Sequence, residues 1–280
     1  MDRSLSTPPL AGGMPYADLH AHTTNSDGTL ELDEVPAAAR DAGVAVVAVT
    51  DHDRTHPGLD APVVERDGVT LVHGIELRVD AGFERVDLLG YGVTETDALA
   101  ALVDRVQTDR AERGQAIIDG VEDHLGVELG IEGRPGLGRP NVARAVADHP
   151  DTDYSVQGVF DDLIGNDGPC YVARDVPDFE QGRDVLAGAS AVVGLAHPFR
   201  YDDPERALAL TETLDAVERD YPYGDDVDAD LAAVDAVARE HDLLVTAGTD
   251  AHGRDLGVRG LDETDYAPFA DRLREHAGGA

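Results

Sequence analysis

The amino-acid sequence predicts an α/β fold built on a mainly parallel sheet, either open or closed into a barrel. Short apolar runs alternate with longer amphipathic stretches along most of the 280 residues, which is typical of strand–helix–strand units with parallel strands. Hydrophobic residues make up 42% of the chain, enough to bury a core, and this argues against global disorder. The length fits one large domain or a domain that carries an insertion.

Seven apolar runs are expected to form the strands of this sheet. In chain order they are Ala17–His22, Val44–Thr50, Val69–Ile75, Val86–Tyr91, Ala191–Ala196, Leu214–Val217 and Leu243–Ala247. Amphipathic stretches between them predict helices, among them Leu32–Asp41 and Asp228–His241. A further helix is expected from about Thr96. Its apolar face, at helical spacing, consists of Leu99, Leu102, Val103 and Val106.

This last helical pattern breaks between Glu132 and Asn141, where glycines and prolines interrupt it. We therefore expect a small inserted unit between two parts of the main domain. The expected divisions are residues 15–109, the insertion at 110–170, and residues 171–280. Residues 1–14, which contain adjacent prolines and adjacent glycines, are expected to form a flexible tail.

The charge balance is strongly acidic. Basic residues number 22, all of them Arg, against 57 acidic residues, which gives a net charge of −35. Such a surface excludes nonspecific binding to duplex DNA or to an anionic membrane through a broad basic face. An acidic tail or a nucleic-acid mimic would concentrate the acids in blocks, but here they are scattered along the chain. We therefore favour adaptation to high salt, in which folding weakens at low ionic strength.

Cysteine usage and hydropathy indicate a soluble cytoplasmic protein. Cys170 is the only cysteine, so no intrachain disulfide forms, and a reducing compartment is the expected one. No apolar run approaches the length of about 18 residues that spans a membrane. The first 14 residues lack the apolar segment of a signal peptide. No obligate protein partner is evident from the sequence.

Histidines and acids follow the apolar runs where strands are expected to end. His20 and His22 are two residues apart, so both imidazoles lie on one face of the strand and can reach the same metal ion. Asp27 follows in a turn sequence that can return its carboxylate to the same rim. The other polar residues at strand ends are Asp51, His52, Asp53, Glu76, His197, Asp250 and His252.

The carboxyl ends of parallel strands converge on one face of a barrel, where active sites form. A single histidine at such an end is more often structural. Two closely spaced pairs together with three further strand-end groups are much harder to explain without a site. A mixture of Asp, Glu and His favours Mn, Zn or Fe over Ca, which prefers oxygen ligands alone. The sequence therefore predicts a metal site.

The order of these motifs, His-x-His, Asp-Gly, Thr-Asp-His, Gly-x-Glu, Ala-His-Pro and Asp-x-His, resembles the PHP family, named for polymerase and histidinol phosphatase. The resemblance runs from about Asp18 to His252. Gly138–Arg144 and Gly168–Val172 are similar to the inserted segment of one branch, which contains nucleoside 3′,5′-bisphosphate phosphatases and 5′-3′ exoribonucleases of short RNA. The resemblance implies a distorted (β/α)7 barrel, the PHP fold, with a small, mainly helical insertion.

The resemblance also implies two or three divalent metal ions (Mn, Zn or Fe). The implied ligands of the first ion are His20, His22, Glu76 and Asp250. Glu76 would bridge to a second ion bound by His197, and a third ion would be bound by Asp27, His52 and His252. The residues expected to act in catalysis are Glu76, His197, Asp250 and His252. One position departs from the family: Asp87 stands where a histidine usually precedes Leu-Leu-Gly, so it is either a ligand of the second ion or one more surface acid. Asp51, next to His52, is either a residue that orients that ligand or a solvated or helix-capping acid.

Paired metal ions lower the pKa of a bound water, which supplies a nucleophile without Ser or Cys and suits a phosphate ester. Substrate contacts are expected from Arg139, Asn141 and Arg200. The segment from Gly130 to Ala147 has three arginines against one acid, an unusual island in this chain. Arg139-Pro140-Asn141 also reads as a helix start, whose free N–H groups suit phosphate. The insertion is therefore expected to bind substrate.

The function expected is that of a metal-dependent phosphoesterase which hydrolyses a small phosphorylated substrate with a metal-bridged hydroxide. A nucleoside 3′,5′-bisphosphate or the 5′ end of short RNA is the favoured substrate, on the branch resemblance. Three alternatives stay open: a histidinol-phosphate phosphatase, an amidohydrolase-like C–N hydrolase, and a metal-binding PHP module without catalysis. Because the chain has no Lys, it cannot be an amidohydrolase-like enzyme of the kind that binds its metals through a carboxylated lysine.

Overall fold

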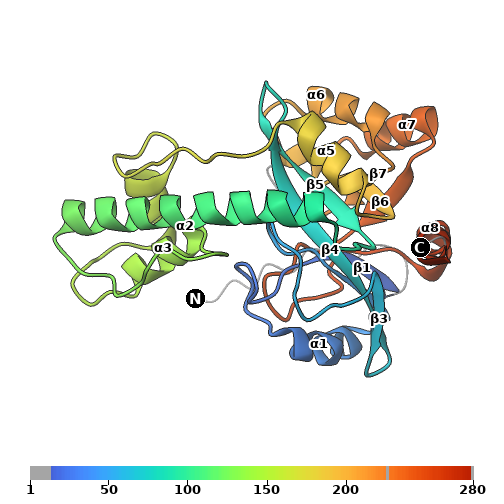
Figure 1. Ribbon diagram of the computed structural model, residues 1–280, viewed down its shortest axis with the longest axis horizontal. Coiled ribbons are helices and arrows are strands. Elements are labelled where there is room, and N and C mark those ends of the chain that lie inside the picture. Colours follow the sequence, from blue (N-terminus) through green and yellow to red (C-terminus); the bar gives the residue numbers. More distant parts are fainter. Residues whose placement is uncertain (1–13, 225–226, 279–280) are drawn as a thin grey trace.

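The computed structural model describes residues 14–224 and 227–278 (Figure 1). The tail expected at residues 1–14 lies outside them, apart from Met14. The strands are β1 (Ala17–Ala21), β2 (Val46–Val49), β3 (Val63–Arg66), β4 (Val69–Asp80), β5 (Arg85–Tyr91), β6 (Val192–Leu195), β7 (Ala216–Asp220) and β8 (Leu244–Ala247). All seven predicted strands are present, and β3 is an addition that the sequence did not suggest.

The strands form one sheet in the order β1-β2-β4-β5-β6-β7-β8, with β3 paired to β4. A bridge between Ala21 and Ala251 joins the two ends of the order, so the sheet is a nearly closed barrel. Pairing is parallel from β1 to β4 and from β6 to β8, as predicted. β5 runs antiparallel to both neighbours, and so does β3 to β4.

The reversal at β5 has a local cause. Only the residues 81–84 separate β4 from β5, which is too short for the crossover that parallel strands need. The turn is closed by the Ala81 N–H, which donates to the Glu84 carbonyl at 2.9 Å, and Gly82 adopts the left-handed conformation (φ 80°). Because β5 runs backwards, its first residues lie at the barrel edge where the parallel strands end.

β4 is five residues longer than the predicted run. Its continuation alternates strictly: Ile75, Leu77 and Val79 are fully buried in a core cluster, whereas Glu76 and Arg78 lie on the opposite face. The polar residues therefore end the apolar run without ending the strand.

The helices are α1 (Val35–Ala42), α2 (Asp97–Leu125), α3 (Arg139–Ala147), α4 (Val156–Val159), α5 (Phe179–Ala187), α6 (Pro204–Ala209), α7 (Leu231–His241) and α8 (Glu263–Gly278). The helices expected at 32–41 and 228–241 are present, the first as a 3-10 turn followed by α1. The Thr96 hydroxyl caps α2 by accepting the Leu99 N–H at 3.2 Å. No helix within residues 14–224 and 227–278 has both the length and the apolar character needed to cross a bilayer.

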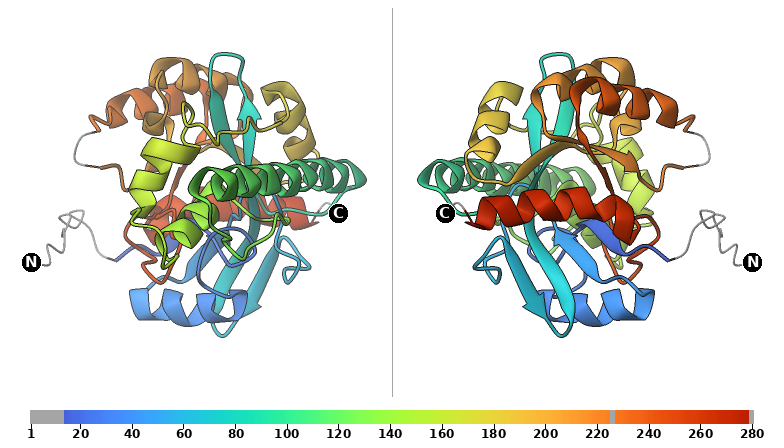
Figure 2. Two further views of the ribbon diagram at one scale, coloured as in Figure 1. Left: turned by 90° about the vertical axis from the view of Figure 1, so that its left-hand side faces the viewer. Right: turned by 90° about the vertical axis from the view of Figure 1, so that its right-hand side faces the viewer.

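The core enclosed by the sheet receives side chains from every barrel strand and from α8, which lies across the barrel on the side opposite α2 (Figures 1 and 2). The predicted apolar face of α2 packs on a second cluster, against Leu77 and Val79. The far part of α2 extends away from the barrel and forms, with α3 and the segment up to Cys170, a separate small core (Figure 1).

α2 is continuous across residue 110, so the expected boundary of the insertion falls inside a helix. A helix that runs through a boundary carries no change in periodicity at that point, which is why the pattern alone cannot mark it. The division at 110 and 170 stays a prediction.

Candidate metal centre

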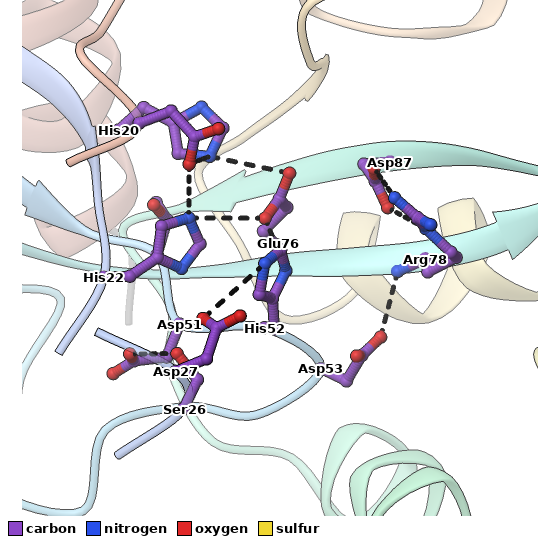
Figure 3. A network of polar contacts seen from close by, with 12 residues as sticks. His20, His22, Ser26, Asp27, Asp51, His52, Asp53, Glu76, Arg78 and Asp87 are labelled. Carbon is purple, nitrogen blue, oxygen red and sulfur yellow. Dashed lines mark hydrogen bonds and ion pairs between the residues drawn. The ribbon is translucent and has the colours of Figure 1, made fainter. Parts of the chain in front are cut away.

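The histidines and acids at the strand ends converge at one edge of the barrel (Figure 3). They form three adjacent groups, and within each group the ligand atoms all lie within 4.8 Å of one another. The groups are His22, Asp27, His52 and His252; His20, His22 and Glu76; and Glu76, Asp87 and His197. Since Glu76 and His22 each belong to two groups, the three form one continuous cluster.

Glu76 is the centre of this cluster and is 1% exposed. Its Oε2 lies 2.6 Å from His52 Nδ1, and its Oε1 lies 2.9 Å from His197 Nε2 and 3.5 Å from His20 Nε2. Burial by itself would raise the pKa of Glu76, but the neighbouring histidines hold that pKa well below its usual range. Burial would likewise lower the pKa of His52, and the Glu76 carboxylate raises it to about 9.

Asp250 closes the cluster from the loop after β8, with a left-handed backbone (φ 53°). Its Oδ1 lies 2.9 Å from His22 Nε2 and 3.6 Å from His20 Nε2. Its Oδ2 accepts a hydrogen bond from the Tyr221 hydroxyl at 2.8 Å and one from Arg200 at 3.3 Å. One oxygen thus faces the histidines while the other is held in place.

The unpartnered polar atoms of the site test whether metal ions fit it. Among the described residues, several buried atoms make no hydrogen bond of acceptable geometry although they lie close to one another: His20 Nε2, His22 Nε2, Asp27 Oδ1, Glu76 Oε2 and Asp250 Oδ1. A buried polar atom without a partner costs about 1–3 kcal/mol. These atoms are imidazole nitrogens and carboxylate oxygens, and they converge, so the donor set fits divalent transition-metal ions.

Asp87 lies in the cluster but is paired to Arg78, which stands directly opposite it in the β4–β5 register. Arg78 Nε donates to Asp87 Oδ1 at 2.7 Å, and a second bond joins Nη2 to Oδ2 (Figure 3). Asp87 Oδ2 also lies 3.7 Å from His197 Nε2. The carboxylate therefore lies within the cluster and is already neutralised by an arginine.

Asp51 does not contact His52. It accepts hydrogen bonds from the Thr23 N–H at 2.8 Å, the Thr23 hydroxyl at 2.7 Å and the Ser26 hydroxyl at 2.7 Å. It thereby fixes the loop that carries Asp27 to the cluster. The role of orienting His52 is therefore not seen, and the hydrogen bonds of Asp51 hold the loop of Asp27 instead.

An arginine-lined cleft of about 260 Å³ opens beside Asp27 and His52. Seven arginines line it: Arg78, Arg85, Arg110, Arg113, Arg139, Arg174 and Arg200. They come from strands, from α2 and α3, and from two loops. Together they are about a third of the 22 basic residues of a chain whose net charge is −35. The cleft is suited to an anionic ligand.

Of the three residues expected to contact substrate, Arg139 and Arg200 line this cleft. Arg139 is the first residue of α3, as predicted, and its guanidinium lies 5.8 Å from the ring centre of Phe160 and 5.9 Å from that of Tyr171. Asn141 Oδ1 instead accepts the Gly138 N–H at 2.8 Å and caps α3. Its contact with substrate stays a prediction.

Two residues beside the cluster had no predicted role: Glu218 was not named, and Asp53 was named only as a polar residue at a strand end. Glu218 is fully buried beside His20, and Asp53 bonds to Arg110, Arg174 and the Arg78 N–H. The arginines lower the pKa of Asp53 to about 2, against the raising effect of burial. Glu218 directly follows the apolar run Leu214–Val217, so the rule that found the other acids would have found it. The five cleft arginines other than Arg139 and Arg200 have no comparable signal.

A phosphoribosyl 1,2-cyclic phosphate 1,2-diphosphodiesterase of Eggerthella lenta is 33% identical over 254 residues, covering 85% of this chain and 94% of the relative. A 3′,5′-nucleoside bisphosphate phosphatase of Chromobacterium violaceum is 27% identical over 275 residues, covering 91% and 93%. A 5′-3′ exoribonuclease of Escherichia coli is 27% identical over 255 residues, covering 84% of each chain.

A solved structure from Bifidobacterium adolescentis, described as a metal-dependent phosphoesterase, superposes with a TM-score of 0.77, covering 95% of this chain and 98% of that one. At 23% identity this likeness shows the fold alone. No family model matches the sequence. The 33% identity to the E. lenta enzyme over most of both chains does show common membership. The chain therefore belongs to the PHP family of metal-dependent phosphoesterases, in the branch of the bisphosphate phosphatases and 5′-3′ exoribonucleases.

Proposed function

We propose that this phosphoesterase hydrolyses one phosphate ester of a small substrate that carries a second anionic group, a nucleoside 3′,5′-bisphosphate being the best candidate. The observation that carries the proposal is the contact between two features: a cluster of metal-binding side chains and a cleft lined by seven arginines. Four of the seven arginines pair with carboxylates, but Arg85, Arg113 and Arg139 make no ion pair among the described residues, and a monophosphate at the cluster would leave their charge unused. A relative of this chain is named for the same substrate class.

Two or three divalent ions, with Mn the first candidate and Zn or Fe the others, complete the proposed centre. His20, His22, Glu76 and Asp250 would hold the first ion. Glu76 and His197, with Asp87, would hold the second, and Asp27, His52 and His252 the third. When bound, such ions lower the pKa of a water and neutralise charge on the phosphoryl oxygens.

The protein side chains supply orientation and electrostatics. Glu76 holds its oxygens between His52 and His197 and cannot turn without breaking one of those contacts. Arg200, fixed by Asp250 and Tyr221, would bind the reacting phosphate from the cleft side. Arg139 would bind the second anionic group. Phe160 and Tyr171, which flank Arg139, would offer aromatic faces to a nucleobase.

A release assay with matched substrates tests the proposal. The purified enzyme with Mn²⁺ receives adenosine 3′,5′-bisphosphate, adenosine 5′-monophosphate and 3′-monophosphate, a 5′-phosphorylated RNA trimer, a ribose 1,2-cyclic phosphate 5-phosphate, histidinol phosphate and an amide panel. We expect the highest kcat/KM with the bisphosphate, and little release from either monophosphate. Faster cleavage of the cyclic diester or of the RNA would replace the proposed substrate. Equal rates on mono- and bisphosphates would remove the role given to the arginines, and inactivity on all with metal bound would favour a binding module.

The composition of the chain supports further parts of the proposal. A net charge of −35 is the pattern of a protein adapted to high salt. Outside the cleft, the same charge repels duplex DNA and anionic membranes, which fits small or short substrates. The single cysteine fits the cytoplasm, and the proposed chemistry needs no protein partner.

A further inference from the structure

Glu218, in β7, is a buried acid that none of the proposed metal groups includes. Its side chain is 0% exposed, and it lies directly beneath the cluster, next to His20. A buried carboxylate requires compensation by hydrogen bonds or charge. The partners that compensate Glu218 are two residues of the proposed centre.

The first partner is His20. Glu218 Oε1 lies 3.0 Å from His20 Nδ1, and an ionised carboxylate only accepts, so the proton of this bond is on Nδ1. The other ring nitrogen, Nε2, then faces Glu76 Oε1 at 3.5 Å and Asp250 Oδ1 at 3.6 Å. His20 Nε2 has no hydrogen-bond partner among the described residues. Glu218 therefore selects the nitrogen that is presented to a metal ion.

The second partner is His197. Glu218 Oε2 accepts its backbone N–H at 2.7 Å. His197 adopts φ 27° and ψ 63°, a left-handed conformation that is costly for a residue with a side chain, by about 1–3 kcal/mol. In this conformation its Nε2 lies 2.9 Å from Glu76 Oε1. The bond from Glu218 thus stabilises the backbone geometry that brings His197 to the second group.

We propose that Glu218 is a positioning residue that couples the first and second metal sites: one carboxylate fixes the ring of His20 and the backbone of His197. Because His20 Nε2 and His197 Nε2 both face Glu76 Oε1, at 3.5 and 2.9 Å, displacement of either histidine disturbs the carboxylate that the two sites share, and loss of either contact then weakens both sites together. This inference rests on the proposed metal centre, and it adds the statement that the two sites fill as a unit.

Glu218→Gln separates the two contacts without changing the volume of the side chain. An amide has one oxygen, so it can accept from the His197 N–H or from His20 Nδ1–H, but not from both with separate oxygens. Asp215 offers a matched control at the other end of the same pair of strands. Its Oδ2 accepts the Val193 N–H of β6 at 3.0 Å, and Asp215→Asn changes that bond in the same way, far from the cluster.

Equilibrium dialysis with elemental analysis measures Mn²⁺ binding by the metal-free wild type, Glu218→Gln and Asp215→Asn. Urea unfolding of the same three proteins in the presence of a metal chelator measures their stability without metal. We expect Glu218→Gln to weaken the two tightest Mn²⁺ equivalents together, by about 10–100-fold, and Asp215→Asn to bind like wild type. Wild type that binds no Mn²⁺ would refute the proposed centre itself. Two results would overturn the coupling alone, with wild type binding Mn²⁺ in both. In the first, Glu218→Gln binds Mn²⁺ as tightly as wild type; in the second, Glu218→Gln loses only one Mn²⁺ equivalent.

Should Glu218→Gln fail to fold, the wild type still tests the inference. Long-range ¹H–¹⁵N spectra of the Zn²⁺-loaded protein, with the His20 signals assigned through His20→Asn, report which ring nitrogen binds metal. Coordination through Nε2 with a proton on Nδ1 supports the role of Glu218. Coordination through Nδ1 contradicts it.

Discussion

Asp87 and Arg78 show how a change of charge at a proposed ligand position is balanced by the residue opposite it in the sheet. The family pattern usually has a neutral histidine at the position of Asp87, and a carboxylate there adds a negative charge to an acidic cluster. Arg78, directly opposite in the sheet, adds a positive one and binds both oxygens. The pair is neutral in total, so the charge of the site is that of the histidine version.

Removal of the arginine from this pair should destabilise the protein in a metal-dependent way. Asp87 is 1% exposed, and in the presence of a metal chelator Arg78→Leu leaves its carboxylate without a countercharge. We therefore expect the free energy of unfolding to fall by about 3 kcal/mol. With Mn²⁺ the loss should shrink, because the ion replaces the guanidinium as partner of the carboxylate. Urea unfolding in chelator and in Mn²⁺ measures both values.

Arg219→Leu is the control for this prediction. Arg219 makes a similar contact with Asp235, but at the exposed surface of β7 and α7. Its loss should cost less than about 1 kcal/mol in either buffer. If Arg78→Leu were equally destabilised with and without Mn²⁺, Asp87 would not be a ligand.

Arg139 allows a test of the substrate site at the level of one residue. Arg139→Ala should raise KM for a nucleoside 3′,5′-bisphosphate by about 10–100-fold, the value of a hydrogen-bonded charge pair, with a smaller change in kcat. Arg144, exposed on the same helix, is the control, and Arg144→Ala should leave KM unchanged. Steady-state phosphate release provides both constants, and an unchanged KM in Arg139→Ala would remove Arg139 from the site.

At the scale of elements, Asp53 connects three parts of the structure. It accepts the Arg78 N–H from β4 at 3.0 Å and pairs with Arg110 of α2 and Arg174 of the segment that returns from the small core to the barrel. Two of the cleft arginines are thus held by one buried carboxylate. The cleft depends on this contact for its shape as well as for its charge.

The low pKa of Asp53 makes this contact sensitive to acid. The folded pKa is about 2, below the ordinary 3.8, so the carboxylate stabilises the native state above pH 4, and this contribution is lost as the pH falls towards 2. The difference corresponds to about 2 kcal/mol. Asp53→Asn should therefore be less stable than wild type by about that amount at pH 5–7, and the gap should close below pH 4. Urea unfolding across this range measures it, and a gap independent of pH would contradict the assignment.

The elements themselves follow well from local pattern. Apolar runs located all seven barrel strands, and the helical spacing from Leu99 to Val106 located the start of α2. The extension of β4 to Asp80 was not predicted, because Glu76 and Arg78 interrupt the apolar run while their neighbours stay buried. The reversal of β5 was therefore not predicted either, since the expected runs left residues 76–85 between them, and only the extension shortens the connection to four residues that cannot form a crossover.

On the scale of the whole molecule, charge is segregated. Acids are spread over the chain, whereas seven of the arginines gather in one cleft. An anionic substrate therefore meets repulsion from most of the surface and attraction only near the cluster. Salt shortens the range of both effects, to about 10 Å at 0.1 M and 3 Å at 1 M.

Stability should consequently rise with salt. Between about 0.1 M and 2 M KCl, screening removes the long-range repulsion of a net charge of −35, and the thermal midpoint should increase. The arginine-to-carboxylate contacts of the buried site are screened less and should persist. Thermal unfolding followed by circular dichroism tests this, with uncharged sucrose as the comparison solute. A midpoint independent of KCl would count against adaptation to salt.

The sequence by itself determined the strands, the family and the residue types of the metal cluster, because each of these is written in short motifs at the ends of apolar runs. Only the tertiary structure decided which side chains meet. The register of β4 and β5 paired Asp87 with Arg78, and barrel closure set Glu218 beneath His20 and His197. The cleft drew its arginines from segments more than a hundred residues apart. Local periodicity records the neighbours of a residue along its own element, whereas contacts between elements depend on how the whole sheet closes.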